Sequence, residues 1–321
     1  MYGVTSPSFV FFNFPTLLPI KRAWALAALV LLLGVATSGC AVRQLAADRL
    51  GDTLSSGGTV FAADDDPELI RAAVPFSLKL MESVLAERPE HLGLLTATAR
   101  GYTQYAYAFV QQEADEIEDK DVAAAYALRE RARKLYRRAR DYALRGLEVA
   151  HPGFAANLKT HSAAALSRTT EADVPRLYWG SAAWAAMIAL SKDNPDAVAD
   201  VPLMSAMIER ALALNEAYDA GALHVFMISL AVARGGAESE TAARRHFQRA
   251  VELSGGRQAG PYVSLAEAVA VQTGNRPEFE RLLAAALKVD PEAAPDWRLA
   301  NTLMQRRARW LLGRTDQLFT E

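Results

Sequence analysis

The sequence of 321 residues contains a single cysteine, Cys40, so no internal disulfide and no cysteine-based metal site can form. It also lacks an excess of either charge, because 35 Lys and Arg stand against 37 Asp and Glu. A near-neutral chain has no general attraction to nucleic acid, which is therefore not expected as a partner. Strand-like alternation is missing from residues 64–321, where helical periodicity recurs instead. These absences predict an all-α protein.

Sequence signatures of catalysis and metal binding are missing as well. The five histidines are scattered without HxxH or HExxH spacing, and neither a GxSxG elbow nor a Walker loop occurs. The glycines at 255–260 follow no strand and are expected to form a turn between two helices. Carboxylates such as Glu113 and Glu116 lie on a polar helix face, where solvation is the expected state. The sequence predicts no enzyme, no metal site and no cofactor.

The first forty residues carry an export signal. The basic pair at 21–22 is followed by an apolar run at 23–37, which is shorter than the roughly 20 apolar residues of a membrane span. Cys40 comes directly after the small residues at 38–39, and this resembles a bacterial lipobox, although Thr37 stands where that pattern prefers an aliphatic residue. An ordinary cleaved signal with an incidental cysteine is the alternative.

This pattern predicts the domain organisation. Residues 1–39 form a lipoprotein signal peptide, 40–63 a lipidated Cys40 with a tether, and 64–321 a helical domain. More than one acyl chain on the cysteine anchors a protein stably, so the mature chain is expected to be membrane-anchored and to face the periplasm. Ala41 follows the cysteine where Asp would suggest retention at the inner membrane, so the outer membrane is favoured.

About a dozen helices with short connections are expected after residue 64. The segment 121–149 illustrates the pattern with an apolar stripe at spacings of three and four, formed by Ala132, Leu135, Tyr136, Ala139, Tyr142, Ala143 and Gly146. Many of its other positions are Arg or Lys. A solvated face paired with a neighbouring helix is the expected explanation, and a docking surface for a partner is the alternative.

The C-terminal part contains a recurring helical-pair signature of the tetratricopeptide type. One unit carries Ala243, Phe247 and Ala250, and the next carries Phe279 and Ala286 at a spacing of 36 residues. Units in the N-terminal half lie at nearly double this spacing, which indicates helices inserted there. The sequence therefore predicts a degenerate tetratricopeptide-like array, closed up by insertions, that encloses a cavity or presents a groove.

Three clusters of aromatic and polar residues are candidates for contact with a ligand or for lining a pore. They comprise Tyr102, Tyr105, Phe109 and Gln112; Tyr178 and Trp179; and Asn301, Arg307 and Trp310. Amphipathic tyrosines and glutamines suit the wall of a ligand cavity, and an arginine beside an amide can orient an anion. Core packing combined with surface salt bridges is the alternative for each cluster.

Several segments together resemble one family, the T component of tetratricopeptide-associated tripartite ATP-independent periplasmic (TRAP) transporters. These segments are 64–91, 101–119, 131–154, 177–195, 246–256 and 297–312. The resemblance implies an all-helical lipoprotein that assembles as a homotrimer and docks to a periplasmic solute-binding protein. It also implies a pore for a small hydrophobic or organic-acid ligand, a lipid attachment at Cys40 and no catalytic residues.

Two functions from different classes follow. The first is an accessory subunit of a TRAP-type transporter, and the second is a general scaffold that holds other envelope proteins together. A through-going cavity lined by tyrosine and glutamine would favour the first function, whereas a solid core with an exposed groove would favour the second.

Overall fold

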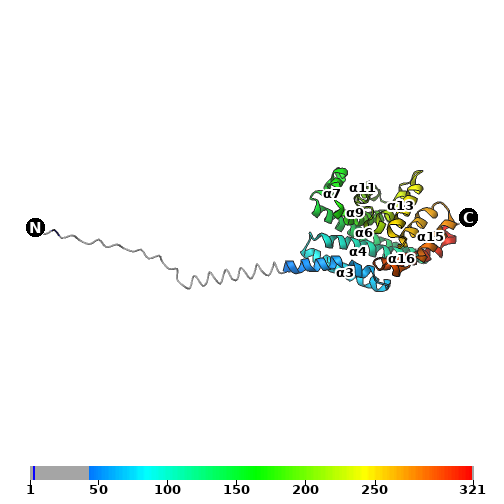
Figure 1. Ribbon diagram of the computed structural model, residues 1–321, viewed down its shortest axis with the longest axis horizontal. Helices are drawn as coiled ribbons and strands as arrows, with labels where there is room; N and C mark the ends of the chain where they lie inside the picture. The colour runs from blue at the N-terminus through cyan, green and yellow to red at the C-terminus, as the bar shows by residue number, and fades with distance from the viewer. Residues whose placement is uncertain (1–2, 4–42, 320–321) are drawn as a thin grey trace. The chain divides into compact units, whose positions relative to one another are not determined.

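The computed structural model describes residue 3 and residues 43–319, and these residues are helical wherever they are regular (Figure 1). No strand occurs in residues 43–319, so the all-α prediction is confirmed. Contacts divide the chain into one unit up to Ala47 and a second unit from Asp48 onward, which holds nearly all of the helices. The signal peptide and Cys40 lie outside the described residues, so the lipid anchor stays a prediction.

Residues 43–63 differ from the expected tether. Positions 43–56 are helical, and α2 (Gly58–Ala62) follows after one turn residue. A Cβ atom added to Gly58 would lie 1.7 Å from the Arg100 guanidinium, so this glycine permits close packing rather than flexibility. The Asp48–Arg88 ion pair and the approach of the Asp52 carboxylate to His91 Nε2 at 3.3 Å also hold the residues from Asp48 onward against the connection between α3 and α4.

The longer helices after residue 63 follow one another through short connections. They are α3 (Pro67–Glu87), α4 (Leu92–Tyr105), α6 (Val122–Ala150), α9 (Val174–Ala189), α11 (Val201–Leu214), α12 (Ala222–Arg234), α13 (Ser239–Ser254), α15 (Arg276–Lys288) and α16 (Arg298–Leu312).

Shorter elements fill the intervals between them. The short α-helices are α5 (Gln112–Ile117), α7 (Phe154–Thr160), α8 (Ser162–Ser167), α10 (Pro195–Ala199), α14 (Gly260–Leu265) and α17 (Thr315–Leu318). The 3₁₀ turns are η2 (Glu171–Asp173), η3 (Tyr218–Gly221), η5 (Pro291–Ala293) and η6 (Pro295–Trp297). Two π-helical turns occur: η1 (Ala106–Gln111) lies between α4 and α5 in one continuous helix, and η4 (Ala266–Ala270) ends the helix that begins with α14.

Helix starts follow the expected local chemistry. The Asp66 carboxylate accepts hydrogen bonds from the backbone N–H groups of Glu68 and Leu69, each at 3.0 Å, and Pro67 occupies the first helical position of α3. Asn275 caps α15 through the N–H of Glu278 at 3.1 Å. These side chains satisfy donors that the helix itself leaves open.

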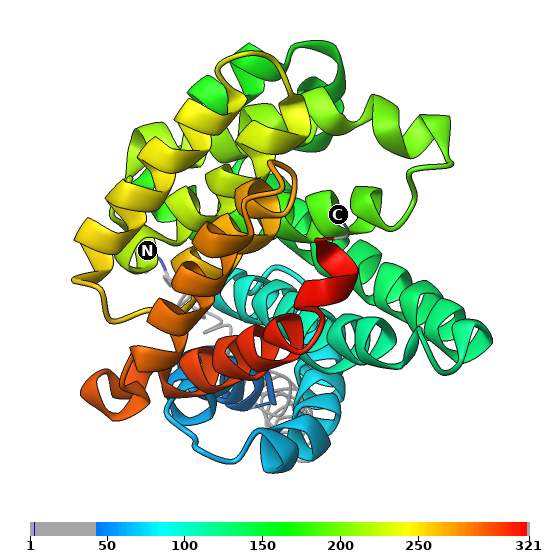
Figure 2. The same cartoon turned by 90° about the vertical axis from the view of Figure 1, so that its right-hand side faces the viewer.

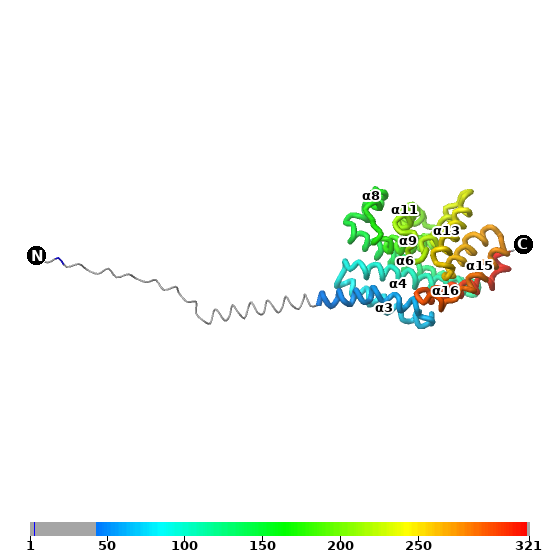
Figure 3. Tube along the Cα trace, viewed as in Figure 1, coloured from blue at the N-terminus to red at the C-terminus, as the bar shows by residue number. Residues whose placement is uncertain are grey.

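The N-terminal half is a stack of helices around α6. Successive contacts run from α3 to α4, from α4 to α6, from α6 to α9 and from α9 to α11, as the tube in Figure 3 shows. The predicted stripe of α6 faces this core, with five of its seven members buried: Ala132, Tyr136, Ala139, Ala143 and Gly146. Leu135 and Tyr142 are partly buried against the same core. The sequence prediction for this helix is confirmed.

The C-terminal half has a second core, formed by helices α12 to α16. Figure 2 shows α13, α15 and α16 in yellow to red along this side of the helical unit. Of the residues that carry the repeat signature, Ala243, Ala250, Phe279 and Ala286 are fully buried, and Phe247 is partly buried against the same core. Helix α16 packs on both cores, because its Leu303 belongs to the first and its Leu311 to the second.

Candidate functional site

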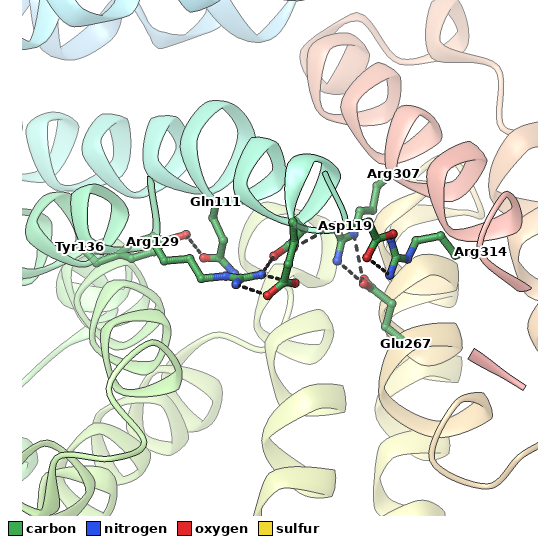
Figure 4. A network of polar contacts seen from close by, with 9 residues as sticks. Gln111, Asp119, Arg129, Tyr136, Glu267, Arg307 and Arg314 are labelled. Carbon is green, nitrogen blue, oxygen red and sulfur yellow. Dashed lines mark hydrogen bonds and ion pairs between the residues drawn. The ribbon is translucent and has the colours of Figure 1, made fainter. Parts of the chain in front are cut away.

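The polar centre of the helical unit is an acidic segment at 113–119, at the end of the continuous helix that α4, η1 and α5 form. Each of its five carboxylates binds an arginine from another element, as Figure 4 shows in part. The pairs are Glu113–Arg71, Asp115–Arg129 and Asp115–Arg307, Glu116–Arg306, Glu118–Arg129, and Asp119–Arg314. The expectation that Glu113 and Glu116 are merely solvated was wrong. Sequence periodicity showed the polar face but not the partners that cover it.

Arg307 lies in the middle of this network. Its Nη1 donates to Asp115 at 3.0 Å, and its Nη2 donates to Glu267 at 2.7 Å. The Arg307 side chain is only 12% exposed, and its guanidinium also lies 4.3 Å from the Trp310 ring centroid. Burial lowers the pKa of Arg307, but Glu267 and the other acidic neighbours outweigh it and leave the pKa above its usual value. Two carboxylates of the protein therefore already balance the charge that was a candidate for binding a ligand anion.

Two further arginines, in α16 and just after it, extend the network. Arg306 donates to Glu116 at 2.8 Å, and Arg314, just after α16, pairs with Asp119. The partners are separated by 190 residues or more along the chain. Together with Arg307, these pairs tie the last long helix of the chain to the acidic segment.

The opposite side of the acidic segment is tied to α6. Arg129 binds Glu118 and Asp115, and the Tyr136 hydroxyl donates to Gln111 Oε1 at 2.7 Å, as Figure 4 shows. Burial raises the pKa of Tyr136 well above its usual value, so this hydroxyl stays protonated and acts as a donor. The segment is thus held between α6 on one side and α16 on the other.

Both π-helical turns contribute to this polar centre. Turn η1 supplies Tyr107, turn η4 supplies Glu267, and Arg307 lies within electrostatic reach of both. Burial and the nearby Glu267 carboxylate raise the pKa of Tyr107 to about 12. A π turn inserts one extra residue into a helix and therefore rotates the residues that follow it. The side-chain pattern contained no signal for either turn, so the sequence analysis missed Tyr107 and Glu267.

The first predicted cluster begins with Tyr102, which is buried and stacked on Tyr142 at 6.3 Å between ring centroids. The Tyr102 hydroxyl accepts a hydrogen bond from Arg138 at 3.1 Å, and the Tyr142 hydroxyl donates to Glu82 at 3.0 Å. Burial raises the pKa of Glu82, but hydrogen bonds from Lys79 and the two tyrosines outweigh it and lower the net pKa.

The rest of the first cluster is also buried. Tyr105 and Phe109 contact each other at 5.7 Å between centroids, and Arg131 lies 5.9 Å from the Tyr105 ring. Gln112 is 2% exposed, and neither polar atom of its side chain makes a hydrogen bond of normal geometry, although the Tyr107 hydroxyl is close enough for Gln112 to lower the pKa of Tyr107. A buried amide without partners is costly. Of the nine candidate ligand residues, Gln112 therefore has the clearest unused hydrogen-bonding capacity.

The second predicted cluster joins the first. Tyr178 and Trp179 meet edge to face at 4.7 Å, and Trp179 packs on Ala99 and Ala143. Tyr142 packs against the same small group and also stacks on the ring of Tyr102. The structure therefore brings two clusters together that are about 75 residues apart in the sequence, within the stack of α4, α6 and α9.

The third predicted cluster stabilises the C-terminal half. Asn301 is 1% exposed, and its Oδ1 accepts from the Ala259 N–H at 2.9 Å while its Nδ2 donates to the Arg257 carbonyl at 2.9 Å. These two bonds fasten the turn at 255–260 to α16. Trp310 lies between the guanidinium groups of Arg307 and Arg314, at 4.3 and 4.9 Å. Contacts with the protein itself occupy the polar groups of this cluster.

Two searches over the described residues complete the description of the site. Within residues 43–319, no group of three or more His, Cys, Asp or Glu side chains is arranged to hold a metal ion. No helix in the same range is long and apolar enough to cross a membrane.

Comparison with known proteins identifies the family. A model of the family described as TRAP transporter T-component matches residues 63–319, which includes all the long helices. A protein of Treponema pallidum (strain Nichols), described only as uncharacterized, is 31% identical over 309 residues and covers 88% of this chain and 94% of its own length. These findings define an accessory component of a TRAP-type transporter. The chain belongs to the TRAP transporter T-component family.

Proposed function

We propose that this accessory protein acts by binding the periplasmic solute-binding protein of its transporter. The observation that carries the proposal is the family match, which extends over the whole helical domain rather than over one short motif. An accessory component of a transporter acts through contacts with the other components. The solute-binding protein is the soluble component of such a system, and it has to meet the other components for transport.

A surface for this contact lies on α3. Leu69 and Phe76 are seven residues apart on this helix, and their side chains are 56% and 75% exposed. Large apolar side chains on a solvent-facing helix are frequent in protein–protein interfaces, where their burial supplies binding energy. We assign this face of α3 to the solute-binding protein.

Affinity purification of the lipidated protein from its native envelope tests the proposal. Recovery of a periplasmic solute-binding protein in stoichiometric amount supports it, and Phe76→Glu should abolish the recovery. Val198→Glu, at an exposed apolar position of α10, is the matched control and should leave the recovery unchanged. Recovery of cell-wall enzymes or assembly machinery instead would establish the scaffold function.

The proposal extends to a ligand path inside the subunit. The buried amide of Gln112, whose aromatic neighbour is Tyr107, is the group that would contact a small hydrophobic or organic-acid ligand. Gln112→Leu should lower solute uptake in a reconstituted transporter, while Gln317→Leu at an exposed position should not. Equal uptake by both variants would show that no ligand passes this residue.

Anchoring and assembly complete the proposal. Cys40→Ala should give a folded protein that no longer fractionates with membranes, and the unchanged chain should fractionate with the outer membrane. Sedimentation of the detergent-solubilised protein should give the mass of a homotrimer. Membrane retention of Cys40→Ala would contradict the lipid anchor without affecting the role in transport.

A further inference from the structure

A pocket of about 200 Å³ opens between α6 and the segment that leads from the end of α9 through α10 to the start of α11. None of the nine candidate ligand residues lines this pocket. Its lining comprises Arg133, Lys134, Arg137, Arg140, Met187, Ser191, Asn194, Asp196, Ala197 and Asp200. The two walls therefore carry opposite charge, with cations on α6 and carboxylates on the facing segment.

The cationic wall follows from the spacing of residues on α6. Arg133, Arg137 and Arg140 recur at intervals of four and three, and Lys134 precedes Arg137 by three, so all four lie on one side of the helix. Arg133 donates to Glu130, and Arg140 donates to its neighbour Asp141. Intramolecular contacts therefore already offset part of this charge.

Lys134 and Arg137 differ from their neighbours on this wall. Both are exposed, and neither makes a hydrogen bond or an ion pair with any residue that the structure describes. Long cationic side chains that face a pocket without a partner retain their full capacity for charge-assisted hydrogen bonds. They can receive a carboxylate without giving up an existing contact.

The acidic wall has complementary capacity. The Asp196 carboxylate has no partner among the described residues, and Asp200 accepts one bond, from the Trp184 indole N–H at 3.2 Å. Both carboxylates therefore keep open acceptor positions on the side of the pocket that faces α6. Met187 and Ala197 supply apolar surface between the two walls.

We propose that this pocket binds a small zwitterion of the free amino acid type. The ligand carboxylate binds Lys134 and Arg137, the ligand ammonium binds Asp196 and Asp200, and the apolar remainder contacts Met187. A simple anion would meet the two aspartates, and a simple cation would meet the basic wall of α6, so each is disfavoured by like charge. This site does not depend on the identity of the transporter partner.

Three probes of matched shape test the proposal on the full-length protein in detergent. L-Leucine carries both charges, 4-methylpentanoate lacks the ammonium group, and 3-methylbutylamine lacks the carboxylate. The NMR signal of the Trp184 indole N–H is the readout, because this group donates to Asp200 at the pocket wall. Leucine should shift the signal saturably, and each analogue should bind about tenfold more weakly or worse, since each loses one charged contact.

Variants locate the binding. Arg137→Gln and Asp196→Asn should each weaken the binding of L-leucine by about tenfold. Arg145→Gln is the matched control, because Arg145 is an exposed arginine of the same helix that does not line the pocket. Circular dichroism should show unchanged helicity in all three variants, since the side chains are on the surface. Binding of 4-methylpentanoate as tight as that of leucine, or no saturable shift with leucine, would overturn the proposal.

Discussion

The two halves of the helical unit bury their cores in different ways. The N-terminal core surrounds the long helix α6 and contains large aromatic side chains such as Tyr102, Tyr136 and Trp184. The C-terminal core consists mainly of alanine and leucine, with Phe279 as its buried aromatic residue. Small residues at regular spacing let helix pairs approach closely and repeat, whereas bulky aromatic residues impose an individual arrangement.

This difference explains why the repeat signature is clear in one half only. In the C-terminal half, Ala250 and Ala286 are fully buried and lie 36 residues apart, and the buried Ala243 and Phe279 have the same spacing. In the N-terminal half, α6 has 29 residues and packs on both α4 and α9, so simple pairs do not recur. Ion pairs from α16 and from Arg314 to the acidic segment at 113–119 join these two halves, whose cores differ in side-chain size and in helix arrangement.

The largest expected effect comes from removing the aromatic residue of the C-terminal core. Phe279→Ala should lower the free energy of unfolding by about 4 kcal/mol, because it deletes a fully buried ring and leaves a cavity. Urea denaturation monitored by tryptophan fluorescence measures this loss. The control Phe76→Ala, at a residue that is 75% exposed, should change stability by less than about 0.5 kcal/mol. Equal losses for the two variants would mean that the C-terminal core contributes little.

A smaller effect is expected at the junction between the halves. Arg307→Met should lower the free energy of unfolding by about 3 kcal/mol, because it leaves Glu267 without its arginine and Asp115 with Arg129 alone, both in partly buried positions. The control Arg234→Met removes a more exposed pair with Glu209 and should cost less than about 1 kcal/mol. The same urea titration compares the two variants, and identical midpoints would contradict a special role for the junction.

Mild acid should lower the stability of the protein at the contact between His224 of α12 and His246 of α13. Burial and the adjacent His224 lower the pKa of His246 to about 4, and the two Nδ1 atoms lie 2.9 Å apart. The unfolded chain therefore binds more protons between pH 6.5 and pH 4, so stability is complete above this range and falls by about 2 kcal/mol as the pH drops through it. His246→Gln should flatten the pH dependence of the melting temperature within this window.

Stronger acid is needed to reach the corresponding group of the N-terminal half. Burial raises the pKa of Asp173, but hydrogen bonds from Arg176, Thr170 and His151 outweigh it and bring the pKa to about 2. The stability that Asp173 contributes is therefore present above pH 3.8 and is lost as the pH falls towards 2. Asp173→Asn should change the melting temperature profile only by a constant offset between pH 4 and pH 6.5. If Asp173→Asn changed the slope of melting temperature against pH between pH 4 and pH 6.5, Asp173 would be titrating in the range assigned here to His246.

The smallest expected effects are at helix caps, one in each half. Asp66→Ala removes the cap of α3 and Asn275→Ala removes the cap of α15, and each should cost about 1 kcal/mol. Similar losses would show that local capping is independent of the type of core. A loss at one site that is several times the other would show that one terminus is coupled to its core.

The sequence predicted those features that depend on local periodicity. The stripe of α6 and the buried positions of the C-terminal repeats could be read from spacing, because each helix shows its own apolar face. The helical segment before Asp64 was missed, because residues up to 63 were interpreted as a tether, whereas Gly58 in fact allows close contact with Arg100. The sequence alone does not distinguish a glycine that gives flexibility from one that allows close packing.

The candidate site could be predicted only in part. All nine residues proposed for ligand contact were recognised as unusual, and eight of them make packing or polar contacts within the protein. The ion pairs of Arg306 and Arg307 bridge about 190 residues, and no local pattern specifies such a partner. The π turns that position Tyr107 and Glu267 carry no composition of their own. Prediction therefore failed where long-range contacts determine the geometry.

The ion pairs between α16 and the acidic segment also have a consequence for the order of events during synthesis. A chain that stops before Arg298 leaves Glu116 and Asp119 without their arginines and Asp115 with one partner instead of two. The acidic segment is complete after about a third of the chain has been synthesised. Its charge is balanced only after the arginines near the C-terminus have been added. A truncated copy would therefore carry uncompensated negative charge at this segment, and the charge is balanced only when nearly the whole chain has been made.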